Sequence, residues 1–224
     1  MLQSEAAGFV LAGGGSTRMG ADKALVEFRG RPLIAHALDI LREAGQIAGT
    51  LMNVSIAGAR SDLGRFAPVI EDESHDIGPL CGICRALEFI SAANANFVSA
   101  IFLSVDQPLM PPSLIVYLMR HAEITGRAVT LASVSGSPQP FPAVVLCAAL
   151  PVLRTELAAG RRGCLRAFAA ASAALGEPVS VVPAELLVQC CQVSQRHALP
   201  AARWFSNLNT PPDLGRAEAF RQGA

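Results

Sequence analysis

The sequence predicts an α/β protein of three layers, in which helices cover both faces of a doubly wound, mostly parallel β-sheet. Short apolar segments alternate along the chain with segments whose apolar residues recur at helical spacing, which is the order of βαβ units. The segment from Phe97 to Val105 is apolar or small almost throughout, as in a central strand covered on both faces. With 224 residues, 51% of them hydrophobic, the chain can bury a large core, and we expect a single domain over residues 1–224.

The amino-terminal half begins with a strand, a glycine loop and a helix. Gly8 to Ala12 is a short apolar segment that ends on three glycines, as does a buried strand that continues into a loop. From Pro32 the apolar residues recur at helical spacing, with Pro32 suited to the first turn and Gly45 to the carboxyl-terminal cap. The other elements expected in this half are strands over 51–57 and 68–70, a helix that begins at Pro79, and the strand 97–105.

The carboxyl-terminal half continues this alternation. Two prolines, Pro111 and Pro112, begin a helix that extends to about His121. Strands are expected over 129–133 and 143–147, on either side of a polar turn over 135–142, and strands this late in such a chain can be antiparallel. The remaining expected elements are helices over 150–159 and 164–174, a strand over 179–182, and a last helix over 211–220.

Composition and charge exclude several classes of protein. The chain has 18 basic and 18 acidic side chains, so its net charge is zero and it offers no electrostatic surface for a nucleic-acid backbone. No apolar segment approaches the ~20 residues that a membrane helix needs. No Lys or Arg precedes Arg18, so the charged segment of a secretory signal is missing. We therefore expect a cytoplasmic protein that binds neither nucleic acid nor membrane, with its six cysteines as reduced thiols.

The loop after the first strand has the composition of a phosphate-binding loop. Gly13, Gly14 and Gly15 leave the backbone bare, so that successive N–H groups can approach a polyphosphate. Arg18 and Lys23 follow at short range and would stabilise a leaving pyrophosphate. The alternative is a flexible surface loop with incidental charges.

Neither of the two common glycine-rich motifs fits this loop. A dinucleotide-binding fingerprint that begins at Gly13 needs its third glycine at position 18, where the sequence has Arg18. A P-loop that begins at Gly15 needs Lys and then Ser or Thr after Gly20, where the sequence has Ala21 and Asp22. A nicotinamide or flavin cofactor and a Walker-type ATPase are therefore disfavoured.

Asp106 is the candidate metal ligand, because it follows directly on the most apolar strand and such strand ends form the ligand site of α/β sheets. Mg²⁺ prefers oxygen ligands and usually takes only one or two carboxylates from the protein. A carboxylate at this place can instead be a turn residue that accepts hydrogen bonds from backbone amides.

The segment LAGGGSTRMGADKALVEFRGRPLIAHAL, residues 11–38, resembles the signature of the MobA-like nucleotidyltransferases, the family of molybdenum cofactor guanylyltransferase. Other segments match the family in order and approximate spacing over essentially the whole chain. They are LMNVS with Asn53, VIEDE with Asp72, GPLCG over 78–82, VDQPLMPP over 105–112 and NLNTPPDL over 207–214.

The resemblance implies a Rossmann-like nucleotidyltransferase fold and an Mg²⁺-dependent enzyme. Such an enzyme transfers GMP from GTP to molybdopterin and releases pyrophosphate, and its partners would be a molybdenum-insertion protein or the target enzyme that receives the cofactor. The resemblance places the metal on Asp106, and with the two loop cations this gives Arg18, Lys23 and Asp106 as the expected catalytic residues. It assigns nucleotide contacts to Leu11, Ala12, Gly13, Lys23, Asn53, Asp72 and Asp106, to which the loop adds Gly14 and Gly15.

Asn53 and Asp72 lie at or after the second and third expected strands, where the base and ribose of a nucleotide are expected. Asn53 is expected to be a buried amide within an apolar strand, and a buried amide needs hydrogen-bond partners. A carboxylate such as that of Asp72 suits the N1–H and 2-amino groups of guanine. The alternative for Asp72 is a solvated acidic run, Glu71 to Glu73.

Several other residues have two interpretations. Arg161 and Arg162 lie between two expected helices, where they could bind the phosphate of the pterin or face solvent. The segment Asn209-Thr210-Pro211 belongs to a family motif but has the composition of a helix cap, which we favour. Cys81 and Cys84 have the spacing of zinc ligands but lie on an expected helix without a second pair nearby, so we expect no zinc site.

Other functions remain open at this point. The same fold and chemistry could use CTP with molybdopterin or a sugar phosphate acceptor, although Gly13-Gly14 resembles the guanylyl branch of the family. A noncatalytic carrier of the pterin or of a nucleotide is the alternative from another class. The stretch Val188 to Arg203 departs from the family pattern just before its last motif, which leaves the acceptor less defined than the reaction.

Overall fold

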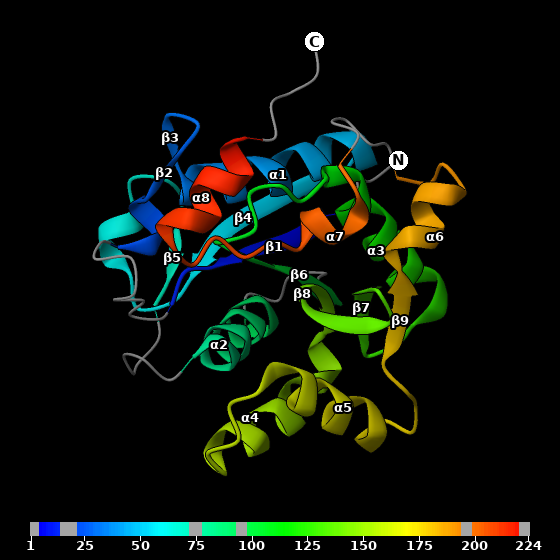
Figure 1. Ribbon diagram of the computed structural model, residues 1–224. Helices are drawn as coiled ribbons and strands as arrows, with labels where there is room; N and C mark the ends of the chain where they lie inside the picture. The colour runs from blue at the N-terminus through cyan, green and yellow to red at the C-terminus, as the bar shows by residue number, and fades with distance from the viewer. Residues whose placement is uncertain (1–4, 14–21, 72–77, 93–97, 194–198, 220–224) are drawn as a thin grey trace.

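A seven-stranded sheet forms the centre of the computed structural model, which describes residues 5–13, 22–71, 78–92, 98–193 and 199–219 (Figure 1). The strands lie in the order β5-β4-β1-β6-β8-β7-β9, and among these described strands only β8 is antiparallel to its neighbours. This confirms the expected doubly wound, mostly parallel sheet. The strands are β1 (Glu5–Leu11), β4 (Leu51–Ala57), β5 (Val69–Ile70), β6 (Ser99–Ser104), β7 (Val129–Val134), β8 (Ser137–Leu146) and β9 (Ser180–Pro183).

The order of the strands reverses direction between β1 and β6. From β1 the chain moves outward to β4 and β5 on one side, and then returns to place β6 on the other side of β1. Leu11 at the end of β1 pairs in parallel with Ser104 at the end of β6. In sheets of this kind, ligands bind beyond the carboxyl ends of the strands at this switch point.

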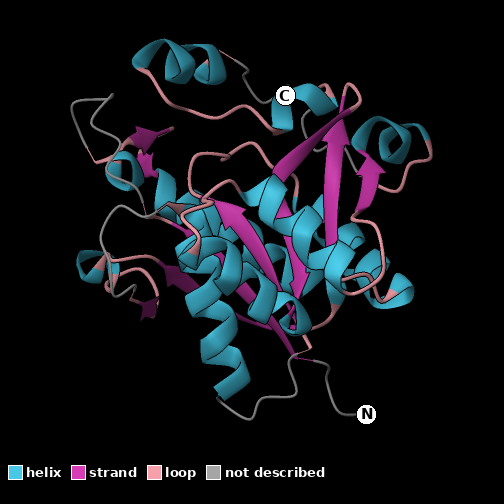
Figure 2. Ribbon diagram, turned by 90° about the horizontal axis from the view of Figure 1, so that it is seen from below, coloured by secondary structure: helices cyan, strands magenta, loops and turns pink. Residues whose placement is uncertain are grey.

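Helices cover both faces of the sheet and complete three layers (Figure 1). One face carries α1 (Leu33–Ala48), α3 (Pro112–Thr125), α6 (Ala184–Gln189), α7 (Ala201–Trp204) and α8 (Pro211–Glu218). The other face carries α2 (Pro79–Ala92), α4 (Leu150–Ala158) and α5 (Cys164–Ala174), which lie in front of the strands in Figure 2. None of these described helices is long and apolar enough to cross a bilayer.

Alternating side chains of the strands supply the two cores. Val10 of β1 and Ile101 of β6 pack on the side of α1 and α3, whereas Phe9 and Phe102 pack on the side of α2. The rings of Phe9 and Phe102 stack with their centroids 5.6 Å apart. This period of two is the geometry of a strand, and both of its faces are buried here.

The turn expected over 135–142 is much shorter than predicted. Ser135 and Gly136 alone connect β7 to β8, both with positive φ, and the prolines that follow lie within β8. This two-residue turn has the positive φ angles of a type I′ hairpin. Pairing of β8 with β6 begins only at Ala143, so the missing N–H groups of these prolines remove no bond to that strand.

Several short elements have no counterpart in the sequence prediction. A hairpin of β2 (Glu27–Phe28) and β3 (Arg31–Pro32) precedes α1, and α6 and α7 lie between β9 and α8. The described residues also form three single 3₁₀ turns: η2 (Lys23–Leu25), η3 (Ser61–Leu63) and η4 (Cys147–Ala149). The first of them carries one of the predicted functional residues, Lys23.

Candidate active site

The carboxyl ends of β1 and β6 bring the start of the glycine loop and Asp106 side by side. The backbone N–H of Val105 donates to the carbonyl oxygen of Leu11 at 3.3 Å, which continues the pairing of the two strands to their ends. Asp106 follows directly and is only 8% exposed. The first described part of the loop, Ala12 and Gly13, therefore lies beside the predicted metal ligand.

Lys23 reaches this place from η2. Its Nζ lies 2.5 Å from Oδ2 of Asp106 and also donates to Oδ1 of Asn209. The second carboxylate oxygen of Asp106, Oδ1, accepts a hydrogen bond from the hydroxyl of Ser104 at 2.5 Å. The Lys23 and Asp106 side chains are 15% and 11% exposed, so the ion pair is largely shielded from water. The electrostatic attraction between its two charges is therefore stronger than in an exposed surface pair.

The local sequence explains how Lys23 is held. Asp22 caps η2, since its Oδ1 accepts from the backbone N–H of Ala24 at 3.0 Å. Ala24 and, shortly after it, Phe28 are buried in the core that α1 completes, which anchors the turn to the body of the protein. The side chain of Lys23 extends from this anchored turn to Asp106.

Asn209 enters the site from the segment before α8. The backbone N–H of Leu208 donates to the carbonyl oxygen of Asp106 at 3.0 Å, which places the next residue, Asn209, beside the Asp106 side chain. The cap of α8 is made by Thr210 and Asp213, so the side chain of Asn209 is left to accept from Lys23. The preferred prediction, a helix cap, is confirmed for Thr210, but it missed the contribution of Asn209.

The pKa of Asp213 is lowered by this cap. The Thr210 hydroxyl donates to the Asp213 carboxylate, which outweighs desolvation, and Arg216 and the backbone N–H groups of Asn209 and Thr210 add to the effect. The cap thus favours the ionised form of Asp213, and it holds the backbone N–H groups of Asn209 and Thr210.

Ser104 is a second site residue that the sequence analysis missed. A serine two positions before a strand-ending aspartate is an inconspicuous feature in an apolar strand. For Asn209 a signal was available, because NLNTPPDL belongs to the segments that resemble the family.

Two glycines permit the close approach of the chain around the start of the loop. Gly58 has φ +145°, and a Cβ atom there would lie 2.8 Å from the backbone nitrogen of Gly13. A Cβ atom on Gly82 of α2 would lie 3.3 Å from Leu11 Cδ2, so the GPLCG segment brings the helix close against the end of β1. The side chains of Leu11 and Ala12 are buried, which leaves their backbone to border the site.

The structure does not bring Asn53 to this site, and the expectation of a buried amide is wrong. Asn53 pairs with Ala7 in the amino-terminal half of β4, four residues before Ala57 and so about 13 Å from the carboxyl end of the strand. Its side chain is exposed. Water can satisfy the amide there, so it needs no partner in the protein or in a ligand.

Four predicted site residues lie outside the described residues: Gly14, Gly15, Arg18 and Asp72. The described chain reaches Gly13 and resumes at Asp22, and it reaches Glu71 and resumes at Gly78. Roles for these four residues therefore remain predictions from the sequence.

Asp106 fits a magnesium ion that is held mainly by a substrate. Within the described ranges, no three side chains of His, Cys, Asp or Glu are grouped as a protein-built cage would need. Each carboxylate oxygen of Asp106 accepts one hydrogen bond and keeps a further lone pair, which suits a single metal bond. Mg²⁺ commonly takes one or two carboxylates, and substrate phosphates and water complete its shell.

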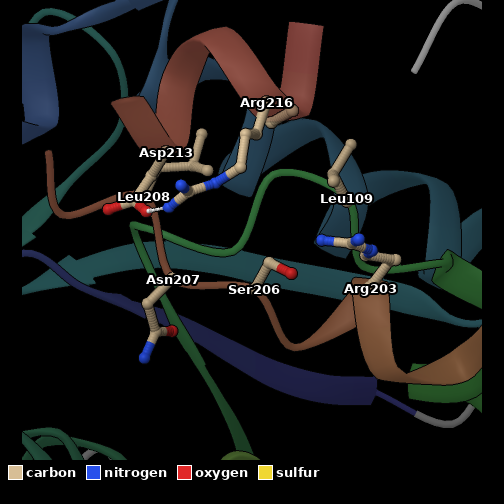
Figure 3. Close-up of a pocket in the computed structure, with 8 residues that line it drawn as sticks. Leu109, Arg203, Ser206, Asn207, Leu208, Asp213 and Arg216 are labelled. Atoms are coloured by element: carbon tan, nitrogen blue, oxygen red, sulfur yellow. Dashed lines mark hydrogen bonds and ion pairs between the residues drawn. The ribbon is translucent and has the colours of Figure 1, made fainter. Parts of the chain in front are cut away.

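A small polar cavity of about 220 Å³ adjoins the site (Figure 3). Leu208, which binds the backbone of Asp106, is part of its wall. Two arginines line it, and one of them, Arg216, points toward Asp213 and pairs with it at 2.6 Å. The full lining is Leu109, Arg203, Ser206, Asn207, Leu208, Asp213, Arg216 and Ala217.

Arg161 and Arg162 lie on the opposite face of the sheet, between α4 and α5. Arg161 donates to both carboxylate oxygens of Glu156, at 2.7 and 2.6 Å, and this lowers the pKa of Glu156. Arg162 is exposed. Of the two interpretations left open by the sequence, the surface role fits this placement.

Known proteins resemble this chain over most of its length. The family model of the MobA-like NTP transferase domain matches residues 8–182. A probable molybdenum cofactor guanylyltransferase of Haloferax mediterranei is 33% identical over 221 residues, which cover 95% of this chain and 93% of the relative. Molybdenum cofactor guanylyltransferase of Rhodobacter capsulatus is 30% identical over 224 residues, or 97% and 98% of the two chains.

Solved structures share the fold. Molybdopterin-guanine dinucleotide biosynthesis protein A from Archaeoglobus fulgidus superposes with a TM-score of 0.71 at 24% identity, covering 95% of this chain and 97% of that one. The 2-C-methyl-D-erythritol 4-phosphate cytidylyltransferase of Thermus thermophilus gives 0.59 at 16% identity, with 94% and 96% covered. The matched domain spans most of the chain and contains the glycine loop, Lys23 and Asp106. The chain therefore belongs to the MobA-like NTP transferase family.

Proposed function

We propose that the protein is a molybdenum cofactor guanylyltransferase, which transfers GMP from GTP to molybdopterin and releases pyrophosphate. The observation that carries this proposal is the convergence of Lys23, Asp106 and Asn209 beyond the switch point of the sheet. Relatives of nearly the same length that bear this name support the choice of substrates.

For this reaction, the protein must position the two substrates and does not need to form a covalent intermediate with them. The terminal phosphate of molybdopterin attacks the α-phosphorus of GTP, a new P–O bond forms, and the bond to the oxygen that bridges to the β-phosphorus breaks. The nucleophile is already ionised, so the protein must hold two anions together and neutralise their repulsion. Lys23 supplies a point charge for this, and Arg18 and the N–H groups of Gly13 to Gly15 would add donors.

Asp106 would hold Mg²⁺, which supplies charge neutralisation on the phosphates when bound. The ammonium of Lys23 lies on the same carboxylate, at Oδ2. We expect Lys23 to turn from Asp106 to the phosphate oxygens as the nucleotide binds, and Asn209 to keep the ammonium within reach of both positions. The ion pair thus keeps both groups oriented for the nucleotide.

For the base, we retain Asp72 as the carboxylate that would accept from the N1–H and the 2-amino group of guanine. For the acceptor, we propose that the cavity beside Asp106 holds an anionic part of molybdopterin, because it is polar and has Arg203 and Arg216 in its wall. The reaction would take place in the cytoplasm, with transfer of the product to a molybdenum-insertion protein or a target enzyme.

The test is a turnover assay with purified protein, GTP, Mg²⁺ and molybdopterin, in which pyrophosphate release and the mass of the product are measured. The Asp106→Ala variant should lose at least ~100-fold in turnover, since a metal or oxyanion donor typically contributes several kcal/mol. Asp39→Asn is the matched control, because Asp39 is an exposed carboxylate of α1 that pairs with Arg31. Unchanged turnover in Asp106→Ala would remove Asp106 from the mechanism.

Substrate choice needs a separate measurement. Thermal unfolding with GTP, CTP or ATP ranks the nucleotides, since a ligand at 100 times its Kd adds ~2.7 kcal/mol of apparent stability. Preference for CTP would indicate a cytidylyltransferase. Tight nucleotide binding without pyrophosphate release from any of them would indicate a carrier.

A further inference from the structure

Arg60 is clamped between two carboxylates beside the candidate site. Its Nη1 donates to Oδ1 of Asp22 at 3.0 Å, and its Nη2 donates to the other oxygen of Asp22. On its other edge, Nε and Nη2 donate to the two oxygens of Asp62 at 2.9 and 2.8 Å. Bidentate pairs of this kind fix the orientation of a guanidinium as well as its position, and the Arg60 side chain is only 19% exposed.

The carboxylate of Asp22 connects this clamp to Lys23. The same Oδ1 that binds Arg60 also accepts from the backbone N–H of Ala24, and the carbonyl of Asp22 accepts from Leu25 at 2.9 Å. Asp22 therefore sets both ends of the 3₁₀ turn from which the Lys23 side chain extends to Asp106. Arg60 is 38 residues away in sequence, on the segment that follows β4.

The charges around Arg60 argue against a direct role on phosphate. Asp22 and Asp62 together more than neutralise the guanidinium, and they occupy Nε and both terminal nitrogens. This pairing holds the pKa of Asp62 below its usual value. A guanidinium engaged in this way holds protein segments together rather than presenting its donors to a ligand.

We infer that Arg60 is a positioning residue for nucleotidyl transfer: through Asp22 it holds the turn that aims the Lys23 ammonium at the site. This inference rests on the role proposed for Lys23. Displacement of a charged group by about 1 Å can cost up to ~100-fold in rate, so loss of the clamp should lower activity although Arg60 does not touch the substrate.

The test is a double-mutant cycle of Arg60→Ala and Lys23→Ala, with kcat/KM for GTP as the readout. Arg60→Ala should lower kcat/KM by about 10- to 100-fold in the wild-type background. In the Lys23→Ala background it should change kcat/KM by less than about twofold, because the group that it positions is gone. Asp22→Asn serves as the second variant if Arg60→Ala fails to fold, and its effect should vanish in the same background.

A merely structural role of Arg60 would give a different result. The losses of the single variants would then multiply in the double variant, and the inference would be wrong. Arg42→Ala is the matched control, since it removes an arginine that pairs with a carboxylate on the outside of α1, and it should leave kcat/KM unchanged. Failure of the wild-type protein to transfer any nucleotide would instead overturn the proposed function, so the two failures are distinguishable.

Discussion

Nζ of Lys23 lies 2.5 Å from Oδ2 of Asp106, although 83 residues separate the two in sequence. The pair joins the end of the glycine loop to the end of β6, on the two strands that flank the switch point of the sheet. Each side chain is the counter-ion of the other, and a charge that is largely buried is costly unless it is paired. The two groups that we propose for phosphate and for a metal are therefore held together as an ion pair.

Asn209→Ala should lower kcat/KM by about tenfold. Asn209 accepts from Lys23, and a hydrogen bond to a charged group is worth about 1.5–3 kcal/mol, so its loss leaves the ammonium less well directed. Steady-state kinetics with GTP and molybdopterin measures this. Wild-type kinetics in Asn209→Ala would show that the contact has no part in the reaction.

The neighbouring variant Thr210→Ala separates this effect from helix capping. The Thr210 side chain accepts from the backbone N–H of Asp213 at the start of α8, and the Asp213 side chain accepts from the backbone N–H of Thr210. The variant loses the first of these bonds and should lose about 1 kcal/mol in the free energy of unfolding. Its kcat/KM should stay within about twofold of wild type, because Asp213 can still accept from the backbone N–H groups of Asn209 and of residue 210 and so hold the Asn209 backbone in place. Urea denaturation followed by circular dichroism measures the loss.

The long strands and helices were predictable because the apolar runs of the strands and the helical spacing of apolar residues in the helices were both strong. Buried strands such as β6 and the amphipathic helix α1 have patterns over enough residues to be recognised. The two-residue strands β2 and β3 and the four-residue helix α7 are too short to have a period, so they were missed. One domain over residues 1–224 stays a prediction, which a single cooperative unfolding transition would support.

The site was predictable where it depends on strand ends and was not where it depends on side-chain direction. Lys23 and Asp106 follow strands that the sequence identified, and their meeting follows from parallel pairing. The strand of Asn53 was predicted with the observed bounds, 51–57, but Asn53 is the third residue of this strand and is exposed, so it is neither a buried amide nor close to the carboxyl end where ligands bind. Asn209 was missed because one segment both caps a helix and contacts Lys23.

Gly58→Ala should reduce both stability and activity. Its φ of +145° is unfavourable for alanine, and the new Cβ atom would lie 2.8 Å from the backbone nitrogen of Gly13, which cannot rotate away. We expect a loss of about 1–3 kcal/mol in the free energy of unfolding and a raised KM for GTP. Gly160→Ala is the control, because it shares the positive φ (+72°) but has open space around it. Equal stability and equal KM in the two variants would exclude a role for the contact with Gly13.

Alkylation should distinguish the buried from the exposed cysteines. Burial raises the pKa of Cys84 and of Cys164 to about 12, so these thiols stay protonated at pH 8, and the thiolate is the reactive form. Cys190 and Cys191 are exposed. Iodoacetamide at pH 8 followed by peptide mass spectrometry should label Cys190 and Cys191, and should label Cys84 and Cys164 only after denaturation.

The same shifts have a consequence for stability at high pH. A thiol whose pKa is raised on folding binds its proton more tightly in the folded state, so unfolding is favoured as pH rises above the ordinary value of 9 toward 12. The midpoint of thermal unfolding should therefore fall between pH 9 and pH 11. In the Cys84→Ala variant, the midpoint of thermal unfolding should fall less steeply over this pH range. A slope identical to that of the wild type would show that the Cys84 thiol does not contribute.

Arg203→Ala should raise KM for molybdopterin by about tenfold and leave KM for GTP within about twofold. The residue lines the polar cavity whose wall includes Leu208, and Leu208 binds the backbone of Asp106. A charged hydrogen bond to the acceptor would be worth about 1.5–3 kcal/mol. Initial rates at varied molybdopterin and saturating GTP measure the first constant, and the reverse titration measures the second.

Arg162→Ala is the matched control, because the sequence left Arg162 as the rival candidate for the pterin phosphate. Arg162 lies between α4 and α5, on the opposite face of the sheet from α7 and α8, and is exposed. A bound acceptor must reach the α-phosphorus beside Asp106, and the Arg203 cavity adjoins that residue. An increase in the KM for molybdopterin in Arg162→Ala, with none in Arg203→Ala, would place the acceptor on the other face and refute the assignment of the cavity.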